Sequence, residues 1–438
     1  MTAFDFTEHV ARARRARTFV VEGRVRDVMG VIVGIEGLMV PVGSELELRL
    51  PGRTLRLEVL GFRDGRLLAA PLGDTTGIAS GMRVRPRIGG ALARVGDGML
   101  GHVVDAFGNP VGSALLGPTV GAPLRAPPPP ALTRRAIVEP LGTGVRALDA
   151  LLPLGLGQRV GLFAGTGVGK STLLGMLCRH ASADVIVVGL IGERGREVGD
   201  FVRQVLGEEG LARSVVVVAT SDEPALVRAR GALYATALAE HFRAEGKRVL
   251  LLMDSVTRYA MALREATLAA GEPPLTKGYT ATVFAALPAL MERAGTCDGE
   301  GSITAIYTVL VEGDDLTDPI SDAVRGVLDG HIILTRKFAD KGLFPAVDVL
   351  RSVSRLAQDL CTPRHLADIA KVREMLGSYE DAADLIQIGA YVTGSDPRVD
   401  RARAVMPRIE SLLRQPLAEG VRREDALGSL HLTADAAR

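Results

Sequence analysis

Short hydrophobic segments separated by polar turns fill the first part of the chain. Between Phe19 and about Arg87 these segments read GVIVGI, LELRL, LRLEVLGF and RLLAAPL, and the turns between them include PVGS, PGR and RDG. Closely spaced short strands of this kind are typical of a small β-barrel or β-sandwich. We therefore predict a small β-barrel domain over residues 19–90.

A different pattern extends from about Glu139 to Leu356. Runs of consecutive apolar and β-branched residues recur there, as in RVGLFAG, DVIVVGLI, SVVVVAT, RVLLLMD and ITAIYTVLV. Strands of a parallel sheet that is covered on both faces have this composition. Because helix-like segments such as KSTLLGMLCRHA and ALYATALAEHFRAEG lie between the runs, the pattern predicts an α/β domain with a mostly parallel sheet over residues 91–365.

The remaining segments have other compositions. Residues 1–18 form an arm with a short helix expected over 4–17, either a solvated chain end or an arm that docks a partner. The glycine-punctuated stretch 96–112 is expected to be a transition, and the proline-rich stretch 122–135 an extended connector. After CTPRHL the chain becomes mostly helical, which predicts a C-terminal helical domain over residues 366–438.

Composition excludes several classes of protein. The 52 Lys and Arg residues nearly balance the 51 Asp and Glu residues, which argues against a dominant nucleic-acid or membrane-surface footprint. The three cysteines form no CxxC pair and the seven histidines form no metal-binding cluster, so a disulfide framework or a structural zinc site is not expected. We find no secretory signal, and apolar runs such as VLLLM are far shorter than a membrane span. We expect a cytoplasmic protein.

The stretch AGTGVGKST, which begins at Ala164, indicates a phosphate-binding loop. It follows a predicted strand and opens a predicted helix, as such a loop requires. Its glycines let backbone N–H groups turn toward a polyphosphate, Lys170 would reach the β- and γ-phosphates, and the Ser171 hydroxyl would ligate Mg²⁺. The strict pattern has glycine in place of Ala164, but that residue ends the strand and leaves the cradle complete. The predicted nucleotide-binding residues are Gly165, Thr166, Gly167, Val168, Gly169, Lys170, Ser171 and Thr172.

Two carboxylates complete this prediction. Asp254 ends the apolar run RVLLLMD, where it would hold the Mg²⁺ shell through water. Glu193, in LIGERGREVGDF, follows the strand after the loop's helix, and the carboxyl ends of neighbouring parallel strands converge on one site. Glu193 can therefore orient the attacking water in hydrolysis, although spacing alone equally allows a solvated acid paired with Arg194.

Longer motifs resemble those of the hexameric rotary ATPase superfamily. They are AGTGVGKST, IGERGRE, LLLMDSVTRYA, LVEGDDLTDP and FPAVDVLRSVSR, and the likeness spans about residues 20–420. Within this superfamily the chain is most similar to the type III export ATPases. KGLFPAVDVLRSVSR and DLIQIGAYVTGSDPRVDRA resemble the flagellar branch more than the virulence-secretion branch.

The resemblance implies roles for individual residues. Glu193 takes the place of the catalytic glutamate, and Arg194 should help to hold the γ-phosphate or its leaving state. Arg258, in SVTRYA, matches an arginine that contacts the γ-phosphate. Arg355, in SVSR, matches the arginine finger that a subunit inserts into its neighbour's site. Phe344 stands where the family stacks an aromatic ring on adenine.

The resemblance also implies a RecA-like P-loop NTPase fold for the α/β core, with ATP as substrate and Mg²⁺ as cofactor. It implies a homohexamer with sites at subunit interfaces and a stalk-like coiled-coil protein in the central pore. Further expected partners are a peripheral regulator bound by the N-terminal arm, export substrates with their chaperones, and a membrane export gate. No nucleic-acid partner is expected. The protein should therefore act in the cytoplasm, peripheral to the inner membrane.

The chain departs from the export family at three positions, expected in the loop region that faces the central pore. Leu263 replaces a glutamine, and GYTATVF, with Thr280 and Ala281, replaces GYPPSVF. Four other functions are alternatives. A virulence-secretion ATPase differs from the flagellar prediction by a few residues; a rotary ATP synthase subunit lacks support because its acidic C-terminal lever is missing. A hexameric RNA translocase would require an aromatic RNA site that residues 19–90 lack, and a non-catalytic scaffold would have lost a catalytic residue.

Overall fold

The computed structural model describes residues 21–87, 90–311 and 317–437, and the expected N-terminal arm at 1–18 therefore lies outside the described residues. The chain divides into two compact units. One contains the chain up to Ala91 together with Ala266–Glu272, and the other contains Leu92–Glu265 and Pro273–Arg438. The C-terminal helices therefore belong to the same unit as the α/β domain.

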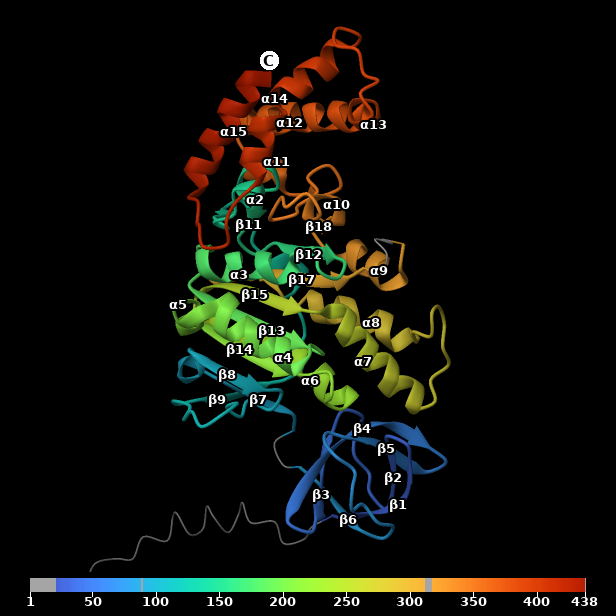
Figure 1. Cartoon of the computed structure of the whole chain (residues 1–438). Helices are drawn as coiled ribbons and strands as arrows, with labels where there is room; N and C mark the ends of the chain where they lie inside the picture. Colours follow the sequence, from blue (N-terminus) through green and yellow to red (C-terminus); the bar gives the residue numbers. More distant parts are fainter. Residues whose placement is uncertain (1–20, 88–89, 312–316, 438) are drawn as a thin grey trace, which may run out of the picture. The chain divides into compact units, whose positions relative to one another are not determined.

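The first unit is built around a closed six-stranded β-barrel, as predicted (Figure 1). The strands follow one another around the barrel in the order β1-β2-β5-β4-β3-β6. In β3 the alternate residues Leu46, Leu48 and Leu50 are buried, because successive side chains of a strand point to opposite faces and one face lines the interior. The strand bounds are Gly23–Met29 (β1), Ile32–Glu36 (β2), Glu45–Leu50 (β3), Arg53–Arg63 (β4), Arg66–Pro71 (β5) and Arg83–Pro86 (β6).

The second unit contains a nine-stranded sheet in the order β19-β18-β12-β17-β15-β13-β14-β8, with β16 paired to β17. All its pairs are parallel except β16 with β17 and β18 with β19, which confirms the predicted α/β core. The bounds are His102–Asp105 (β8), Arg159–Ala164 (β12), Val185–Ile191 (β13), Ser214–Ala219 (β14), Arg248–Asp254 (β15), Gly295–Thr296 (β16), Ser302–Leu310 (β17), Gly330–Leu334 (β18) and Val353–Ser354 (β19). Every residue of β13 is buried, as a strand with two covered faces requires.

The structure adds strands that were not among the named hydrophobic runs, and β8 is one of them. β8 lies inside the stretch 96–112, which was expected to be only a transition, and it pairs in parallel with β14 from His102 to Asp105. Only two of its four residues are apolar, so it is too short to produce a strand signal. Two small antiparallel pairs accompany it, β7 (Leu92–Val95) with β9 (Val120–Pro123) and β10 (Pro140–Leu141) with β11 (Leu154–Gly155).

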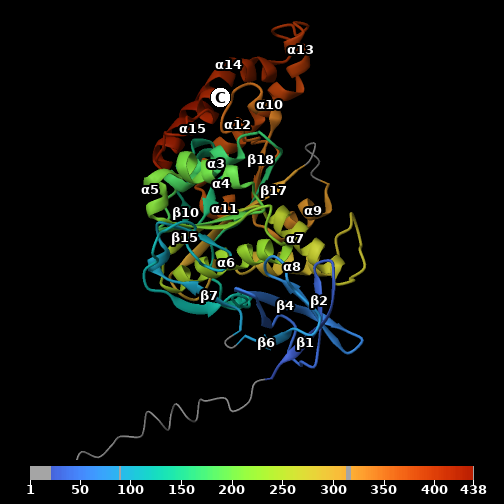
Figure 2. The same cartoon turned by 60° about the horizontal axis from the view of Figure 1, so that its bottom comes forward.

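Helices surround this sheet, and α6 packs against β13, β14 and β15 (Figure 2). The helices of the α/β part are α2 (Arg146–Leu151), α3 (Lys170–His180), α4 (Gly195–Asp200), α5 (Gly207–Ala212), α6 (Ala225–Ala244), α7 (Val256–Ala269), α8 (Ala281–Met291), α9 (Pro319–Val327), α10 (Arg336–Ala339) and α11 (Ala357–Leu360). Two short 3₁₀ turns, Asp97–Met99 and Ala131–Thr133, and a π-helical turn, Phe201–Leu206, complete the described elements of this part.

The C-terminal part is helical, as predicted. It consists of α12 (Pro363–Asp381), α13 (Ala383–Gln387), α14 (Pro397–Leu413) and α15 (Arg423–Ala437). Thr362 and Asp396 cap the N-termini of α12 and α14, each followed by a proline, which needs no N–H partner at the first helical position. α12, α14 and α15 pack on one another, and α15 packs on α2 (Figure 1). No helix in the described part of the chain is both long and apolar enough to cross a membrane.

One sequence expectation concerning the pore-facing region is wrong. Leu263 lies inside helix α7, where it was expected in a loop. Thr280 and Ala281 lie at the start of α8, with buried Thr280 as the N-cap residue and exposed Ala281 as the first helical residue. Threonine is a residue type that favours N-caps, but the side chain of Thr280 makes no capping hydrogen bond to α8.

Candidate active site

The phosphate-binding loop joins the end of β12 to the start of α3. Gly167 and Gly169 have φ angles of 78° and 92°, which residues with a side chain rarely adopt. A side chain at Gly169 would also lie 3.2 Å from the ring of Phe344. Ala164, by contrast, is buried at the end of β12, between Leu310 of β17 and Leu334 of β18. A glycine is therefore not needed at position 164.

Lys170, the first residue of α3, contacts both predicted carboxylates. Its Nζ lies 2.6 Å from Asp254 Oδ1 and 3.5 Å from Glu193 Oε1. The three residues meet because β12, β15 and β13 end at the same edge of the sheet. Burial lowers the pKa of Lys170, but Asp254 and Glu193 outweigh this effect, so the pKa is raised and the ammonium stays charged.

Glu193 lies just beyond β13 and is largely shielded from solvent. Burial raises the pKa of its carboxyl, the nearby Asp254 raises it further, and Lys170 opposes both effects. The buried Oε1 has no hydrogen bond within the part of the chain that the structure describes. The sequence also allowed Glu193 to be merely the partner of Arg194. In the structure Arg194 pairs with Glu197 instead, at 3.4 Å.

A cavity of about 430 Å³ opens between the loop and these side chains, a volume suited to a small organic ligand. Of the predicted residues it is lined by Gly165, Thr166, Gly167, Gly169, Lys170, Ser171, Thr172, Glu193, Arg194, Asp254 and Arg258. It is also lined by five residues that the sequence analysis did not select: Leu190, Glu197, Val198, Phe201 and Leu310. Glu197 had a signal, because it follows Glu193 by four residues within the same motif.

Arg258 reaches the cavity from α7. Its Nε is buried and has no hydrogen bond in the described part of the chain. Gly192, with a φ of 72°, lies against it, and a side chain there would come within 2.9 Å of Arg258 Cβ. Gly192 therefore leaves the room that the arginine occupies, a requirement that the motif alone did not reveal.

Phe344 and Arg336 flank the loop from the side of β18. Phe344 is 36% exposed and faces Gly169, so its ring borders the loop without lining the cavity beside Lys170. Arg336 Nη2 donates to the carbonyl oxygen of Thr166 at 2.9 Å and so fixes the first turn of the loop. Val168, a predicted binding residue, is buried beneath the loop and does not line the cavity.

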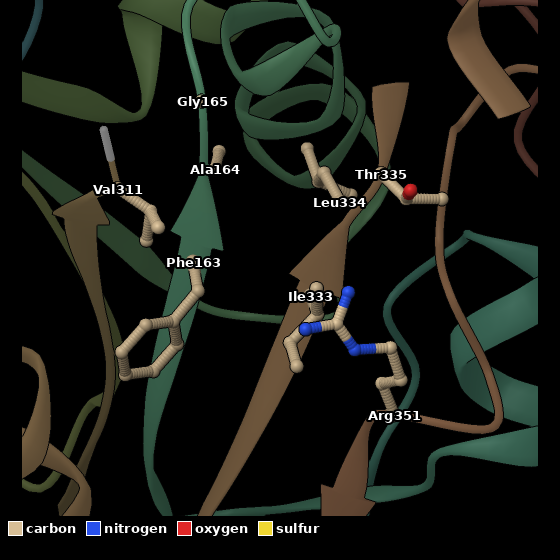
Figure 3. Close-up of a pocket in the computed structure, with 8 residues that line it drawn as sticks. All are labelled: Phe163, Ala164, Gly165, Val311, Ile333, Leu334, Thr335 and Arg351. Carbon is tan, nitrogen blue, oxygen red and sulfur yellow. The ribbon is translucent and has the colours of Figure 1, made fainter. Parts of the chain in front are cut away.

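A second, much smaller hollow lies beside the loop, between β12 and β18 (Figure 3). Phe163, Ala164, Ile333 and Arg351 are among its lining residues, and the guanidinium of Arg351 lies beside Ile333. Its volume of about 10 Å³ would admit one water molecule at most. The cavity of about 430 Å³, which the phosphate-binding loop lines, is therefore the candidate nucleotide site.

Arg355 does not line the cavity. It follows β19, its side chain is exposed, and its Nη2 lies 3.4 Å from the carbonyl oxygen of Arg325. Within this chain the candidate site contains Arg194 and Arg258 but not Arg355.

A glycine loop between a strand and a helix, with its lysine held by a carboxylate from a nearby strand end, defines a P-loop nucleoside triphosphatase with a RecA-like core. Comparison with protein families agrees. Residues 144–354 match the ATP synthase alpha/beta family, nucleotide-binding domain, and residues 361–432 match the T3SS EscN ATPase C-terminal domain.

Known proteins resemble the chain over nearly its whole length. It is 48% identical to the flagellum-specific ATP synthase of Salmonella typhimurium, covering 99% of this chain and 97% of the relative. It is 47% identical to the type 3 secretion system ATPase of Xanthomonas euvesicatoria, covering 90% of each. The solved structure of the assembled ATPase EscN from enteropathogenic E. coli superimposes with a TM-score of 0.89 at 42% identity, over 94% of this chain and all of that one. The chain belongs to the type III export ATPase family.

Proposed function

We propose that this chain hydrolyses ATP as the ATPase of a type III protein export apparatus, that of a flagellum, and that it helps to unload and feed export substrates. The observation that carries the proposal is the contact of Lys170 with both Asp254 and Glu193 beneath the phosphate loop. A lysine for the phosphates, a carboxylate for the cation and a carboxylate for the water are the groups that hydrolysis requires. Membership of the export ATPase family supports the same reaction.

The residues at the site fit a nucleotide with Mg²⁺. The left-handed Gly167 and Gly169 suit a loop that turns N–H groups toward phosphate, and α3 contributes its N-terminus. Mg²⁺ prefers oxygen ligands and keeps several waters, which suits the Ser171 hydroxyl and the Asp254 carboxylate. The cation would neutralise charge on the phosphates. Phe344, beside the loop, would stack on the adenine ring.

Each remaining side chain then has a task. Glu193 orients and polarises the attacking water. Its buried Oε1 makes no hydrogen bond in the described part of the chain and can accept one once Lys170, 3.5 Å away, turns to the phosphates. Lys170 exchanges its carboxylate contacts for the β- and γ-phosphates. Arg258 and Arg194, which line the same cavity, stabilise negative charge on the γ-phosphate.

Arg355 serves the site of a neighbouring subunit. Its exposure and its position outside its own chain's cavity suit a group that acts in trans. We therefore propose a homohexamer with sites at subunit interfaces. Similarity to the assembled EscN, and to EscN in complex with its central stalk EscO (TM-score 0.87, 41% identity), supports this assembly and a stalk-like coiled-coil partner.

The same proposal includes the remaining partners and the location. The protein works in the cytoplasm, peripheral to the inner membrane, where it meets export substrates with their chaperones and the membrane export gate. A peripheral regulator binds the N-terminal arm. Nucleic acid is not a partner, in line with the balanced charge of the chain.

Flagellar export and virulence secretion are distinguished by experiment. Identity separates the two branches little, with 48% to the flagellar relatives of Bacillus subtilis and Salmonella typhimurium and 47% to the secretion ATPase of Xanthomonas euvesicatoria. Deletion of the gene should abolish flagellar filaments and swimming, and the wild-type gene, but not a Glu193→Gln copy, should restore both. Normal filaments in the deletion strain would assign the chain to the virulence branch.

A further inference from the structure

Thr308 occupies a special place in the sheet. It lies on β17, the strand between β12, which leads into the phosphate loop, and β15, which ends in Asp254. In the register Thr308 is the partner of Leu162 on β12, and its neighbour Tyr307 is the partner of Met253 on β15. The side chain of Thr308 is completely buried. Neither the motifs nor the cavity lining had selected it.

The hydroxyl of Thr308 forms a hydrogen bond with Asp254, the carboxylate proposed to hold Mg²⁺. Its Oγ1 lies 2.7 Å from Asp254 Oδ1 and 3.3 Å from the carbonyl oxygen of Met253. A hydroxyl has one proton to donate. The shorter contact to a charged oxygen is the stronger bond, so the proton goes to Asp254.

Asp254 Oδ1 therefore accepts from two donors, because Lys170 Nζ lies 2.6 Å from the same oxygen. The two donors differ in how firmly they are held. Lys170 sits on a flexible four-carbon chain, and in the proposed function it serves the phosphates. Thr308 is β-branched, has one side-chain torsion and is fixed within a central strand.

We propose that Thr308 is a positioning residue of the nucleotide site: its hydroxyl holds Asp254 Oδ1 and so fixes the rotamer of the carboxylate that would hold the hydrated Mg²⁺. The proposal rests on the assigned role of Asp254 in the cation site. When the ammonium of Lys170 turns to the phosphates, Thr308 keeps the carboxylate in the same rotamer. Without the hydroxyl, the carboxylate would lose its remaining fixed donor within the sheet and rotate about its terminal torsion, which has a broad energy profile.

The test measures how strongly Mg²⁺ improves nucleotide binding in the full-length protein. A fluorescent ADP is titrated once with Mg²⁺ and once with EDTA, and the ratio of the two Kd values is the Mg²⁺ effect. Thr308→Val keeps the shape of the side chain and removes the hydroxyl, so the Mg²⁺ effect should fall about tenfold while binding in EDTA is unchanged. Thr308→Ser should retain the wild-type Mg²⁺ effect. If Thr308→Val does not fold, Thr308→Ala makes the same test with a smaller side chain.

Thr304→Val is the matched control. Thr304 is buried on the same strand. Its hydroxyl accepts a hydrogen bond from the N–H of Gly157 and donates one to the carbonyl oxygen of Gly155, away from Asp254. Its Mg²⁺ effect should equal that of the wild type. A wild-type Mg²⁺ effect in Thr308→Val, or an equal loss of affinity with and without Mg²⁺, would overturn the inference.

Asp254→Asn separates this inference from the function on which it rests. If Asp254→Asn loses the Mg²⁺ effect and Thr308→Val keeps it, only the role of Thr308 is wrong. If Asp254→Asn also keeps the full Mg²⁺ effect, the assignment of the cation site itself is wrong.

Discussion

Lys170 forms an ion pair with Asp254, with 2.6 Å between Nζ and Oδ1. The pair forms although β17 lies between β12, which precedes Lys170, and β15, which ends in Asp254. This ion pair places the ammonium group of Lys170 beside the carboxylate assigned to Mg²⁺. A phosphate group would enter between the loop and the carboxylates as a competing anion. The relationship makes Lys170 the first residue to test.

Lys170→Met should lower the affinity for ATP by about ten- to a hundredfold, because a hydrogen bond from a charged donor to phosphate is lost. Turnover should fall with it. The measurements are nucleotide titration and ATP hydrolysis by the full-length protein. Lys337→Met, which removes an exposed lysine paired with Glu380 on the surface, is the control and should behave as the wild type.

Glu193→Gln should bind ATP but hydrolyse it about 10²–10⁴ times more slowly, because glutamine cannot accept the proton of the attacking water. Steady-state hydrolysis and nucleotide titration of the same preparation separate the two effects. Glu209→Gln alters an exposed acid on α5 and should leave both quantities unchanged. Unchanged turnover in Glu193→Gln would remove this residue from the mechanism.

The same substitution predicts a pH dependence of stability. The pKa of Glu193 is raised in the folded protein by burial and by Asp254, so ionising the carboxyl costs folding free energy at neutral pH. Glu193→Gln avoids this cost. Its melting temperature should exceed that of the wild type at neutral pH, and the difference should shrink as the pH falls and vanish below the ordinary glutamate value of 4.5. A difference that grows toward low pH would contradict the raised pKa.

The sequence predicted the fold well where hydrophobic runs are long. β13 and β15, with seven residues each, were recognised, whereas β8 was missed because two valines give no strand pattern. The convergence of Glu193 on the site of Lys170 followed from a general rule about parallel strand ends.

Other parts of the site could not be predicted, because they depend on neighbours that are distant in sequence. Thr308 contacts Asp254 because β17 and β15 are neighbours in the sheet. Gly192 is required because Arg258 packs on it. Leu263 was assigned to a loop region from the family resemblance, whereas it lies inside α7.

Arg355→Ala should lose most ATP hydrolysis, since an arginine finger changes the rate by about 10³–10⁵, while each subunit still binds nucleotide. A mixing experiment tests action in trans. Arg355→Ala subunits retain Glu193, and Glu193→Gln subunits retain Arg355, so mixed assemblies contain interfaces with both groups. The mixture should recover activity that neither variant has alone. No recovery in assemblies that contain both subunits would mean that Arg355 acts within its own chain or not at all.

Phe344→Ala should weaken the binding of ATP by about 1–3 kcal/mol, the usual value of a base stacked on an aromatic ring. The loss should appear in the affinity and in KM more than in kcat, because the ring borders the loop at Gly169 and lies away from Glu193 and Asp254. Phe344→Tyr keeps the ring and should bind as the wild type does. Inorganic triphosphate has no base, so its competition with ATP gives a second control: its affinity should be the same in Phe344→Ala and in the wild type. If triphosphate binding falls as much as ATP binding, the ring supports the loop and does not hold the base.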